Sequence, residues 1–497
     1  MILTTLPVDK RIAFAVAFDD INNDGQLDIL WGQYFNEWLY NTENQNVLLM
    51  QQNGQFIEQG LPGPPGSALT ALFSDVTGDG NRELMIGNEF DQADIHYRSV
   101  LTHDFESWND YWPAVPHSTM SIVSADIDND LTFETYHAQI THNPTSGDLR
   151  VPLIKKQDYF DKHCHKNDSQ MCVELEQQVK TMSANRRKMA GSCLSIEGDA
   201  KFECLALLLT RPNIRDSYEA VQVEERTELC ELLASYSTEL RDHCVHKLMI
   251  IAERKANELQ RITQTDQSAG DRNVIKPAKQ IKQVGRVNLL YKHNQNSQAT
   301  EVAKQYGIDI TGWAWNAKFA DLDGDSWQDL FVVNGYSEQQ AMTSNAWYRN
   351  INGNKFNEQA ADVGLEFFKD MLSYLYIDVD NDGDLDIIGF DIQGHLHSWI
   401  NNENNNNHIQ IELRDSKNNI NGIGAKVVIR YGENNSKHQI REVKASGGFL
   451  SIDAAIVHFG VKNAEQVQEI EVIDSANVLH TFKGPFDTNR RYRLNLK

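Results

Sequence analysis

Long apolar runs and positive charge are both scarce in this sequence. No stretch of about 18 consecutive apolar residues occurs, so the sequence predicts no transmembrane helix. The 46 Lys and Arg residues are outnumbered by 70 Asp and Glu residues, which gives a net charge of −24. A protein this acidic repels nucleic-acid phosphates and anionic membranes. We therefore expect neither as a partner, and the charge favours a protein that collects cations.

Cysteine is absent from most of the chain. All six cysteines lie between Cys164 and Cys244. An even, clustered set favours disulfides and an oxidising compartment. The apolar segment of a signal peptide is also missing, because residues 1–7 are too short for one. We expect a secreted, periplasmic or cell-surface protein in which Met1 replaces a removed export signal.

Familiar catalytic signatures are missing as well. The sequence contains no Ser/His/Asp signature, no nucleophile elbow and no phosphate-cradling loop. Gly422 and Gly424 precede a predicted strand, unlike the glycines of a dinucleotide-binding turn. The sequence thus indicates no catalytic residue and no organic cofactor, and it leaves open whether the protein is an enzyme.

The strongest positive signal is an acidic loop, Asp378-Val-Asp-Asn-Asp-Gly-Asp-Leu-Asp386. Carboxylates occupy positions 1, 3, 5 and 9 of this loop, and Gly383 at position 6 permits a sharp turn. Carboxylates this close stay ionised together only when a cation joins them. Hard oxygen ligands at alternate positions, with the carbonyl of position 7, suit Ca²⁺ best.

The same loop occurs five times, beginning at residues 20, 75, 126, 321 and 378. Position 6 is not glycine in two loops, where it is Leu131 and Ser326. Such a residue carries strain of about 1 kcal/mol or more, so we expect the loop at Asp126 to be the weakest site. Up to five Ca²⁺ ions are predicted. The predicted ligands are positions 1, 3, 5, 7 and 9 of each loop: Asp20, Asn22, Asp24, Gln26 and Asp28; Asp75, Thr77, Asp79, Asn81 and Glu83; Asp126, Asp128, Asp130, Thr132 and Glu134; Asp321, Asp323, Asp325, Trp327 and Asp329; Asp378, Asp380, Asp382, Asp384 and Asp386.

Two other interpretations of these loops compete with the first. An EF-hand needs a Glu at position 12 and flanking helices, whereas predicted strands flank these loops. The second alternative is an acidic surface turn that binds no metal, although recurrence in five loops weighs against it. Position 12 is never Glu: it is Trp31, Ile86, His137, Val332 and Gly389.

The loops recur with a period of about 55 residues, apart from one much longer interval. Apolar strands flank each loop, as residues 13–18 and 27–32 do around the first. A third strand with aromatic residues and a short fourth strand follow, as in residues 345–350 and 355–358. Four short strands per repeat are typical of a propeller blade, with the loop joining the first two. We predict a mainly β fold containing a calcium-loop β-propeller.

The long interval contains a predicted insert. Residues 135–140 form the second strand of a split repeat and residues 286–291 its third, while helical apolar spacing lies between them. We predict a disulfide-stapled α-helical insert. Alternating strands after the polar residues 401–407 predict a C-terminal β-sandwich. The predicted domains are 1–144 (propeller, first part), 145–284 (insert), 285–403 (propeller, second part) and 404–497 (sandwich).

The five loops and their flanking strands resemble FG-GAP/VCBS repeats, as in integrin α-subunit propellers. Residues 421–426, 446–451 and 457–460 (Asn-Gly-Ile-Gly-Ala-Lys, Ser-Gly-Gly-Phe-Leu-Ser and Val-His-Phe-Gly) resemble the ASPIC/UnbV domain. The combination is similar to the cartilage acidic protein family and its bacterial secreted relatives, over about 1–142 and 286–497. The resemblance implies a calcium-binding propeller. The cysteine-rich insert departs from the pattern, and the blades are fewer than is usual.

We expect the protein to bind another macromolecule, a protein or a glycan, with the insert as the recognition element. Loops on a rigid scaffold commonly carry recognition. A polysaccharide lyase or hydrolase is the alternative, because calcium-loop propellers of related families host such activities. Four aromatic residues could stack on sugars or fill the spaces between blades: Trp313, Trp315, Trp327 and Trp347.

A further alternative is capture of Cu²⁺ or Zn²⁺ by the insert. If Cys164 pairs with Cys244, the imidazoles beside them gather at one end of the insert, as a transition-metal site requires. A plain structural disulfide with solvated histidines is the competing interpretation. The imidazoles concerned are His163, His165, His243 and His246.

Overall fold

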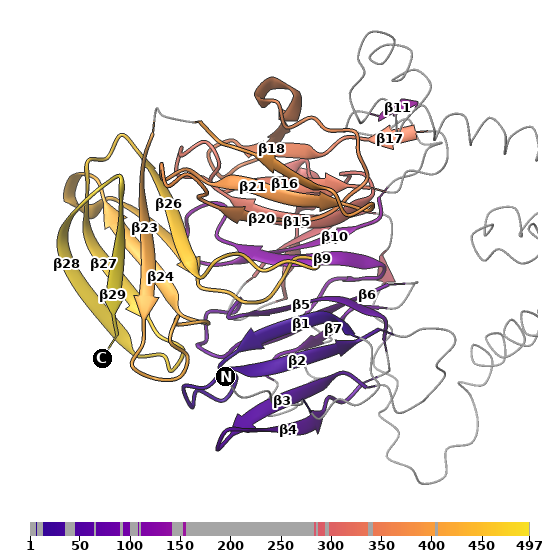
Figure 1. The fold of residues 1–497 in the computed structure, drawn as a ribbon, viewed down its shortest axis with the longest axis horizontal. Coiled ribbons are helices and arrows are strands. Elements are labelled where there is room, and N and C mark those ends of the chain that lie inside the picture. The colour runs from indigo at the N-terminus through magenta and orange to yellow at the C-terminus, as the bar shows by residue number, and fades with distance from the viewer. Residues whose placement is uncertain are drawn as a thin grey trace, which may run out of the picture. The chain divides into compact units, whose positions relative to one another are not determined.

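Figure 1 shows a computed structural model of the chain. The chain divides into two compact units, Met1–Lys155 with Pro277–Lys497, and Lys156–Lys276. The second unit lies outside the described residues, and with it the six cysteines and the four histidines of the predicted insert. No helix in the described part is long and apolar enough to cross a membrane. The structure describes residues 6, 13–34, 45–63, 66–89, 93–99, 108, 111–141, 153–155, 283–284, 287–293, 298–335, 341–402 and 406–496.

Five separate antiparallel sheets follow one another along the first unit (Figure 1). In every sheet a first strand of 7 residues returns through an acidic loop into a second strand of 6 residues. We number the sheets 1 to 5. Sheet 1 contains β1 (Ala13–Asp19), β2 (Asp28–Gln33), β3 (Val47–Gln52) and β4 (Gln55–Gly60); sheet 2 contains β5 (Ala68–Ser74), β6 (Glu83–Asn88) and β7 (Ile95–Tyr97); sheet 3 contains β9 (Thr119–Ala125), β10 (Glu134–Gln139), β13 (Leu289–Lys292) and β14 (Thr300–Glu301); sheet 4 contains β15 (Ala314–Ala320), β16 (Asp329–Asn334), β18 (Ala346–Asn350) and β19 (Phe356–Glu358); sheet 5 contains β20 (Met371–Ile377), β21 (Asp386–Asp391) and β22 (Leu396–Trp399).

The acidic loops sit at the same register in all five sheets. The last residue of the first strand pairs with position 9 of the loop, as Asp19 does with Asp28 and Ile377 with Asp386. The predicted repeat is therefore confirmed, as is the prediction that each loop joins the first two strands of its unit. We call residues 20–28, 75–83, 126–134, 321–329 and 378–386 loops 1 to 5.

Burial is deepest in the sheets that have a neighbour on each side. Every residue of β5, β6, β9 and β10 is buried, whereas the outer strands β4 and β22 are largely exposed or half-buried. The first strands contact one another in chain order, from β1 through β5, β9 and β15 to β20. The predicted mainly β fold is confirmed as a series of sheets. The described strands do not show the closed ring of a propeller.

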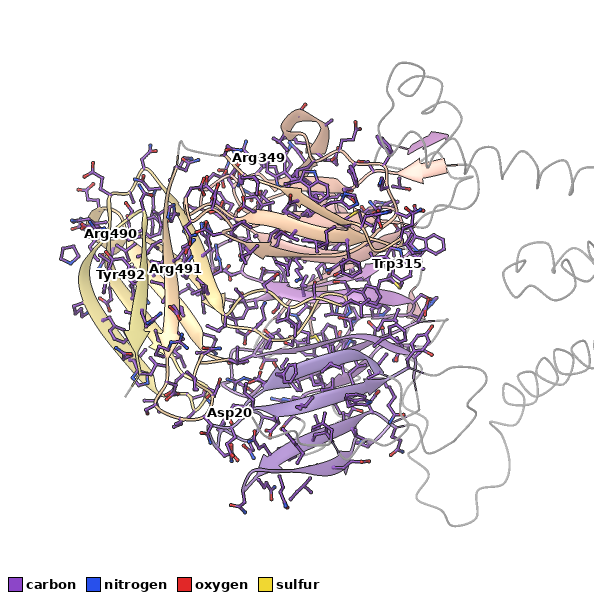
Figure 2. The ribbon with its side chains drawn as sticks, in the orientation of Figure 1. Asp20, Trp315, Arg349, Arg490, Arg491 and Tyr492 are labelled. Carbon is purple, nitrogen blue, oxygen red and sulfur yellow. The ribbon has the colours of Figure 1, made fainter. Side chains whose placement is uncertain are left out.

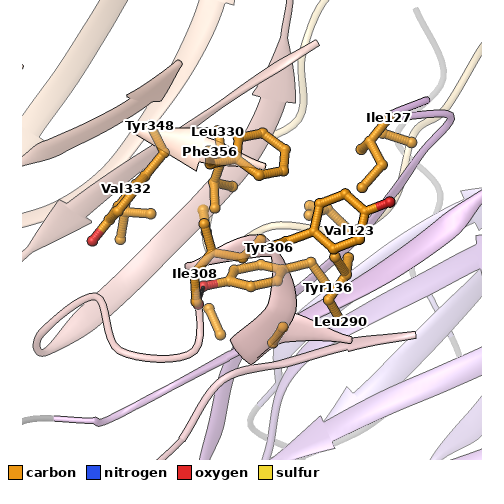
Figure 3. Packing of buried hydrophobic residues seen from close by; sticks show 14 of the residues in the cluster. Val123, Ile127, Tyr136, Leu290, Tyr306, Ile308, Leu330, Val332, Tyr348 and Phe356 are labelled. Carbon is orange, nitrogen blue, oxygen red and sulfur yellow. Dashed lines mark hydrogen bonds between the residues drawn. The ribbon is translucent and has the colours of Figure 1, made fainter. Parts of the chain in front are cut away.

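Apolar side chains fill the space between adjacent sheets, as Figure 3 shows for sheets 3 and 4. Val123, Tyr136 and Leu290 come from sheet 3, and they pack with Leu330 and Tyr348 of sheet 4. Burying one such side chain is worth about 1.5–3 kcal/mol. Packing of this kind joins adjacent sheets, and hydrogen bonds between loops 3 and 4 add to it, such as Asn129 Nδ2 to Ser326 O at 3.0 Å.

The four tryptophans considered for sugar stacking differ in burial, and Figure 2 labels one of them, Trp315. Trp347 is 5% exposed in the core between sheets 4 and 5, and Trp315 stacks on Phe449 with ring centroids 5.3 Å apart. Trp313 and Trp327 are half-buried. The filling interpretation is confirmed for Trp347, and none of the four side chains is fully exposed.

Residues 406–496, which we call the C-terminal domain, form two sheets around one core. Ile409 and Phe459 of one sheet are fully buried against Val427 and Ile470 of the other. The strands predicted from alternation are all present. One sheet contains β23 (Asn407–Arg414), β26 (Ile456–Lys462) and β29 (Arg490–Asn495), and the other β24 (Lys426–Tyr431), β25 (Lys437–Glu442), β27 (Gln466–Ile473) and β28 (Leu479–Asp487).

Helix is scarce in the described part of the chain. It is limited to the single turn α7 (Ala303–Tyr306) and two 3-10 turns, η3 (Ala360–Val363) and η4 (Glu433–Asn435). The predicted helices of the insert lie outside the described residues.

Sheet 3 is split in sequence as predicted. Its second strand β10 pairs with β13, and the amide of Gln139 donates to Asn288 Oδ1 at 2.8 Å. Two short pieces of the predicted insert are strands rather than helices. β11 (Leu153–Lys155) pairs with β17 (Ala341–Thr343), and β12 (Gln283–Val284) pairs with β8 (Val115–Pro116). These two end pieces of the predicted insert therefore belong to the first unit.

Candidate metal loops under the C-terminal domain

One hydrogen bond closes all five acidic loops in the same way. The carboxylate at position 9 accepts the backbone N–H of position 2, as Asp28 does from Ile21 at 3.2 Å and Asp386 from Val379 at 2.8 Å. The equivalent distances in loops 2, 3 and 4 are 2.9, 3.1 and 3.2 Å. This bond fixes the position 9 carboxylate against the loop backbone.

Position 6 has a left-handed backbone in every loop. Its φ is +82°, +89° and +102° at Gly25, Gly80 and Gly383, and +70° and +83° at Leu131 and Ser326. In loops 1 to 4 its N–H donates to the position 1 carboxylate, at 2.9–3.2 Å. Loops 3 and 4 therefore adopt a conformation that favours glycine, which gives the expected strain a structural basis.

The loops bring carboxylates together and leave some of their oxygens unbonded. Three acidic groups per loop lie within 4.8 Å of one another in loops 2 to 5. In loop 1, position 3 is Asn22, whose Nδ2 donates to Asp24 Oδ2 at 3.2 Å. The acidic groups are Asp75, Asp79 and Glu83; Asp126, Asp128 and Glu134; Asp321, Asp323 and Asp325; and Asp378, Asp380 and Asp386.

Buried oxygens without partners provide the test of fit to a metal. Oδ1 of Asp75, Asp128, Asp321 and Asp378 is buried and has no hydrogen-bond partner. A buried carboxylate oxygen without a partner is costly, and a hard cation is the ligand that it suits. The atoms that these acidic groups offer to a metal are all oxygens. The residues therefore fit Ca²⁺ and lack the nitrogen or sulfur ligands that select transition metals.

Burial also shifts the acidity of the loops. It raises the pKa of Asp28 and of Asp126 to about 7 and that of Asp321 to about 8, with neighbouring carboxylates adding to the effect. The charged forms are thus disfavoured unless a cation is close by.

The backbone N–H of position 7 donates to the position 5 carboxylate, for example from Gln26 to Asp24 at 2.8 Å and from Asp384 to Asp382 at 3.0 Å. In loops 2 and 3 the position 7 side chain donates to the same carboxylate, from Asn81 Nδ2 at 3.1 Å and from Thr132 Oγ1 at 2.5 Å. The carbonyl ligand predicted at position 7 stays a prediction.

Two known protein-family patterns match this sequence. The FG-GAP-like repeat pattern matches residues 20–86 and 321–389, and the ASPIC and UnbV pattern matches residues 415–494. The chain carries FG-GAP-like repeats and an ASPIC and UnbV domain. Comparison with curated proteins gives no significant match.

A similar solved structure is the V. cholerae biofilm matrix protein Bap1, with 10% sequence identity and a TM-score of 0.27. The match covers 96% of this chain and 60% of that chain, so this chain spans less than two thirds of Bap1's length.

The C-terminal domain, residues 406–496, contains the ASPIC and UnbV match and is called the ASPIC and UnbV domain from here on. It contacts the acidic loops. Ser475 donates to Asp20 of loop 1 at 2.8 Å, and Gln410 donates to Asp378 of loop 5 at 2.8 Å.

Lys426 forms an ion pair with Asp75 of loop 2. In loop 4, Gly324 O accepts from Lys462 N at 3.2 Å. Loops 1, 2, 4 and 5 therefore contact this domain directly, although positions such as Asp130 and Asp382 remain exposed.

One segment of the domain, Lys444–Asp453, crosses the first strands of all five sheets; we call it the crossing segment. It contains Gly447 and Gly448, both with positive φ. A Cβ on Gly447 would meet the Ile122 carbonyl at 2.9 Å, so the close approach requires glycine there. Its contacts, one per sheet in order, are Phe18 N to Ala445 O (3.0 Å), Gly447 N to Ala71 O (2.6 Å), Gly448 N to Ile122 O (3.0 Å), Phe449 N to Asn316 Oδ1 (3.1 Å) and Tyr376 N to Asp453 Oδ1 (2.9 Å).

A cavity of about 280 Å³ lies between the loops and the ASPIC and UnbV domain. Charges of both signs line it, among them Lys318, Asp321, Arg441 and Glu442. Arg441 is 8% exposed and donates to Gln439 Oε1 at 2.8 Å. Sequence reasoning did not find the crossing segment or this cavity, although the Gly-Gly pair at 447–448 marked a tight backbone approach.

Proposed function

We propose that this protein is an extracellular calcium-dependent binding protein. Ca²⁺ in FG-GAP-like loops fixes the ASPIC and UnbV domain on the sheets, and the assembled molecule binds a protein or a glycan. The observation that carries the proposal is the buried, unbonded carboxylate oxygen of Asp75 in loop 2 and of Asp378 in loop 5, two glycine-containing loops that contact the domain. Removing the cation leaves carboxylates facing one another at the interface, in a chain whose net charge is already −24.

The proposal includes a propeller-like arrangement of the five sheets. The crossing segment contacts the first strand of each sheet in turn, which requires these strands to line a common surface. In a propeller the first strands are the innermost ones, and they surround a central channel. The crossing segment then lies along that channel, where it replaces missing blades as the partner of the inner strands.

The insert is the proposed recognition element. The chain enters it after β10 and returns through β13, at the end of sheet 3 that is remote from loop 3. Loop 3 and the other acidic loops face the ASPIC and UnbV domain. The insert is therefore attached at the sheet end opposite to the acidic loops.

Calcium uptake is tested first, by equilibrium dialysis and by thermal unfolding with Ca²⁺ and with a chelator. The expected result is bound Ca²⁺ and a higher melting temperature in its presence, because only the folded loops bind it. An unchanged melting curve and no bound Ca²⁺ would remove the calcium part of the proposal.

Recognition is tested by capture of secreted proteins and extracellular polysaccharides on the immobilised full chain. The matched variant replaces residues 156–276 with a Gly/Ser linker, which keeps β11 and β12 and their pairing to the sheets. Specific capture by the full chain and none by the variant is expected. Equal capture by both places recognition on the sheets or on the ASPIC and UnbV domain, and capture by neither contradicts the binding function.

A further inference from the structure

The third strand of each sheet places one residue at an equivalent position beside its acidic loop. Position 10 of the loop pairs with a third-strand residue, as Ile29 does with Leu49 and Leu330 with Tyr348. The next residue on the third strand lies beside position 9. In sheets 1 to 5 this residue is Met50, Arg98, Lys292, Arg349 and Ile400.

A hydrogen bond shows that these positions are structurally equivalent. One residue further along, the backbone N–H donates to Oδ1 of the position 9 aspartate, from Gln51 at 2.7 Å, from Asn350 at 2.8 Å and from Asn401 at 2.7 Å. Sheets 1, 4 and 5 share this geometry. The chemical difference among them lies in the side chain just before that amide.

That side chain is cationic in the loops that depart from the full motif. Loops 1 and 5 have glycine at position 6 and Asp at position 9, and they face Met50 and Ile400. Loops 3 and 4 lack the glycine, and they face Lys292 and Arg349.

Both cations reach into their loops. Lys292 Nζ bonds Asp128 and lies 3.8 Å from Glu134 Oε1. The Nε of Arg349 lies 2.5 Å from Asp323 Oδ2, and its Nη2 lies 3.1 Å from Asp325 Oδ2. A tethered cation with charge-assisted hydrogen bonds to the ligand oxygens competes directly with a free one.

We propose that Lys292 and Arg349 serve as built-in cations of loops 3 and 4, so that these two loops do not take up Ca²⁺. This inference rests on the proposed function, in which the other loops bind Ca²⁺.

Loop 2 faces cations too, because Arg98 lies 3.8 Å from Asp79 and Lys426 of the ASPIC and UnbV domain bonds Asp75. The third-strand residue alone does not decide loop 2, and the inference concerns loops 3 and 4. The chain binds at most three Ca²⁺ ions instead of the five that its motifs predict.

The test counts bound Ca²⁺ by equilibrium dialysis in the wild type and in Lys292→Met and Arg349→Met, which copy the residue of sheet 1. Each substitution is expected to add one Ca²⁺ per chain. Arg430→Met is the matched control. Arg430 lies away from the loops, forms an ion pair with Glu471 at 2.9 Å, and is about as exposed as the other two cations. It should leave the count unchanged.

The outcomes separate this inference from the function on which it rests. No Ca²⁺ bound by the wild type rejects the calcium proposal itself. Two results would overturn only the inference that Lys292 and Arg349 act as built-in cations. They are four or five Ca²⁺ ions bound by the wild type, and no additional bound ion in the folded Met variants. The reverse substitution Ile400→Arg, at a side chain that is 43% exposed, keeps the test available if the Met variants do not fold. It should remove one ion.

A second inference has an independent basis, a buried imidazole cluster between sheets 2 and 3. Asp94, His96 and His137 each offer a ligand atom, and these atoms lie within 4.8 Å of one another. His137 is fully buried and His96 is 3% exposed. The indole of Trp112 stacks on the His96 ring with centroids 4.3 Å apart.

The hydrogen bonds leave ring nitrogens available. His137 Nδ1 lies 3.0 Å from Asp94 Oδ2, and because the carboxylate can only accept, Nδ1 carries the proton. The lone pair of His137 Nε2 is then free, and this buried atom has no hydrogen-bond partner. His96 Nε2 is buried without a partner as well. A carboxylate that orients the imidazole in this way is typical of metal-binding histidines.

We propose that His96 and His137 bind a transition metal of the Zn²⁺ class, with Asp94 orienting the His137 ring. Two imidazole nitrogens are ligands that such ions prefer and that Ca²⁺ does not. This site differs from the one predicted at the insert histidines.

The probe is Co²⁺, added to the metal-stripped full chain with excess Ca²⁺ so that the oxygen-only loops are filled. Visible absorption reports imidazole coordination. One Co²⁺ band is expected in the wild type and in the control His293→Gln, because both ring nitrogens of His293 are already hydrogen-bonded. The band should be lost in His96→Gln, on the edge strand β7, and in His137→Gln. No band, or a band unchanged in His96→Gln, overturns the site and leaves a neutral packed cluster.

Discussion

At the scale of single residues, the acidic loops depend on backbone conformation as much as on carboxylates. Gly383 at position 6 of loop 5 has φ +102°, and a Cβ there would lie 1.8 Å from His408 Cε1. His408 is 8% exposed, so its ring has little room to move away. The residue at position 6 must therefore tolerate a left-handed conformation and also leave space for the ASPIC and UnbV domain.

Gly383→Ala is predicted to cost about 2–4 kcal/mol of unfolding free energy, the sum of strain and overpacking. Gly394→Ala is the matched control, because Gly394 has φ +86° and a Cβ there meets nothing within 4 Å. It should cost about 1 kcal/mol, from strain alone. Denaturant unfolding of both variants measures the difference, and equal costs would contradict the close contact with His408.

Asp391 makes a separate residue-scale prediction about pH. Burial alone would raise the pKa of this carboxyl, but hydrogen bonds from His397 and His395 outweigh it and the pKa is lowered. A lowered carboxyl pKa contributes stability that is present above the unfolded pKa of about 4 and is lost as pH falls through the folded value.

Asp391→Asn should therefore lower the unfolding free energy by about 1–3 kcal/mol at pH 7, and by progressively less below pH ~4. Denaturant unfolding at several pH values checks this. The exposed Asp362 supplies the control Asp362→Asn, which should have little effect at any pH. A deficit that is independent of pH would show that the charge of Asp391 contributes nothing.

At the scale of elements, the sequence predicts what repeats and what alternates. The loops from Asp20 to Asp386, their flanking strands and the split of sheet 3 follow from local patterns, and the structure has them. The built-in cations could not be predicted, because Lys292 is distant in sequence from Asp128 and only strand register brings them together. The crossing segment could not be predicted for the same reason. Residues 444–453 contact first strands that are distant in sequence, beginning with β1 at Ala13.

The crossing segment yields the element-scale prediction. Phe449 is 3% exposed, packs with Leu69 and Met120, and stacks on Trp315. Phe449→Ala should cost about 3–5 kcal/mol, because a buried aromatic is removed where rigid strands cannot close the cavity. Phe14→Ala, at an aromatic residue that is 40% exposed, should cost far less.

Limited proteolysis with denaturant unfolding checks this prediction. In Phe449→Ala the ASPIC and UnbV domain should be released from the sheets more readily than in the wild type. If both variants unfold alike, the crossing segment does not hold the domain and the sheets together.

At the scale of the whole molecule, the interface between the sheets and the ASPIC and UnbV domain gathers the acidic loops of a chain with net charge −24. Charge of one sign at an interface opposes association, and cations reverse that effect. The chain provides some of them itself, as in the pair Lys426–Asp75. Ca²⁺ provides the rest in the proposed function, so cation binding and docking of the domain are linked equilibria.

Position 5 of two loops tests this linkage, because Asp382 in loop 5 and Asp130 in loop 3 are both exposed. A site saturated 100-fold above its dissociation constant adds about 2.7 kcal/mol to the unfolding free energy. Asp382→Ala should lose that calcium-dependent increment at loop 5. Asp130→Ala should keep the full response of the wild type, because Lys292 already neutralises loop 3. Thermal unfolding with and without Ca²⁺ gives both increments, and an equal loss in the two variants would show that loop 3 binds Ca²⁺ despite its lysine.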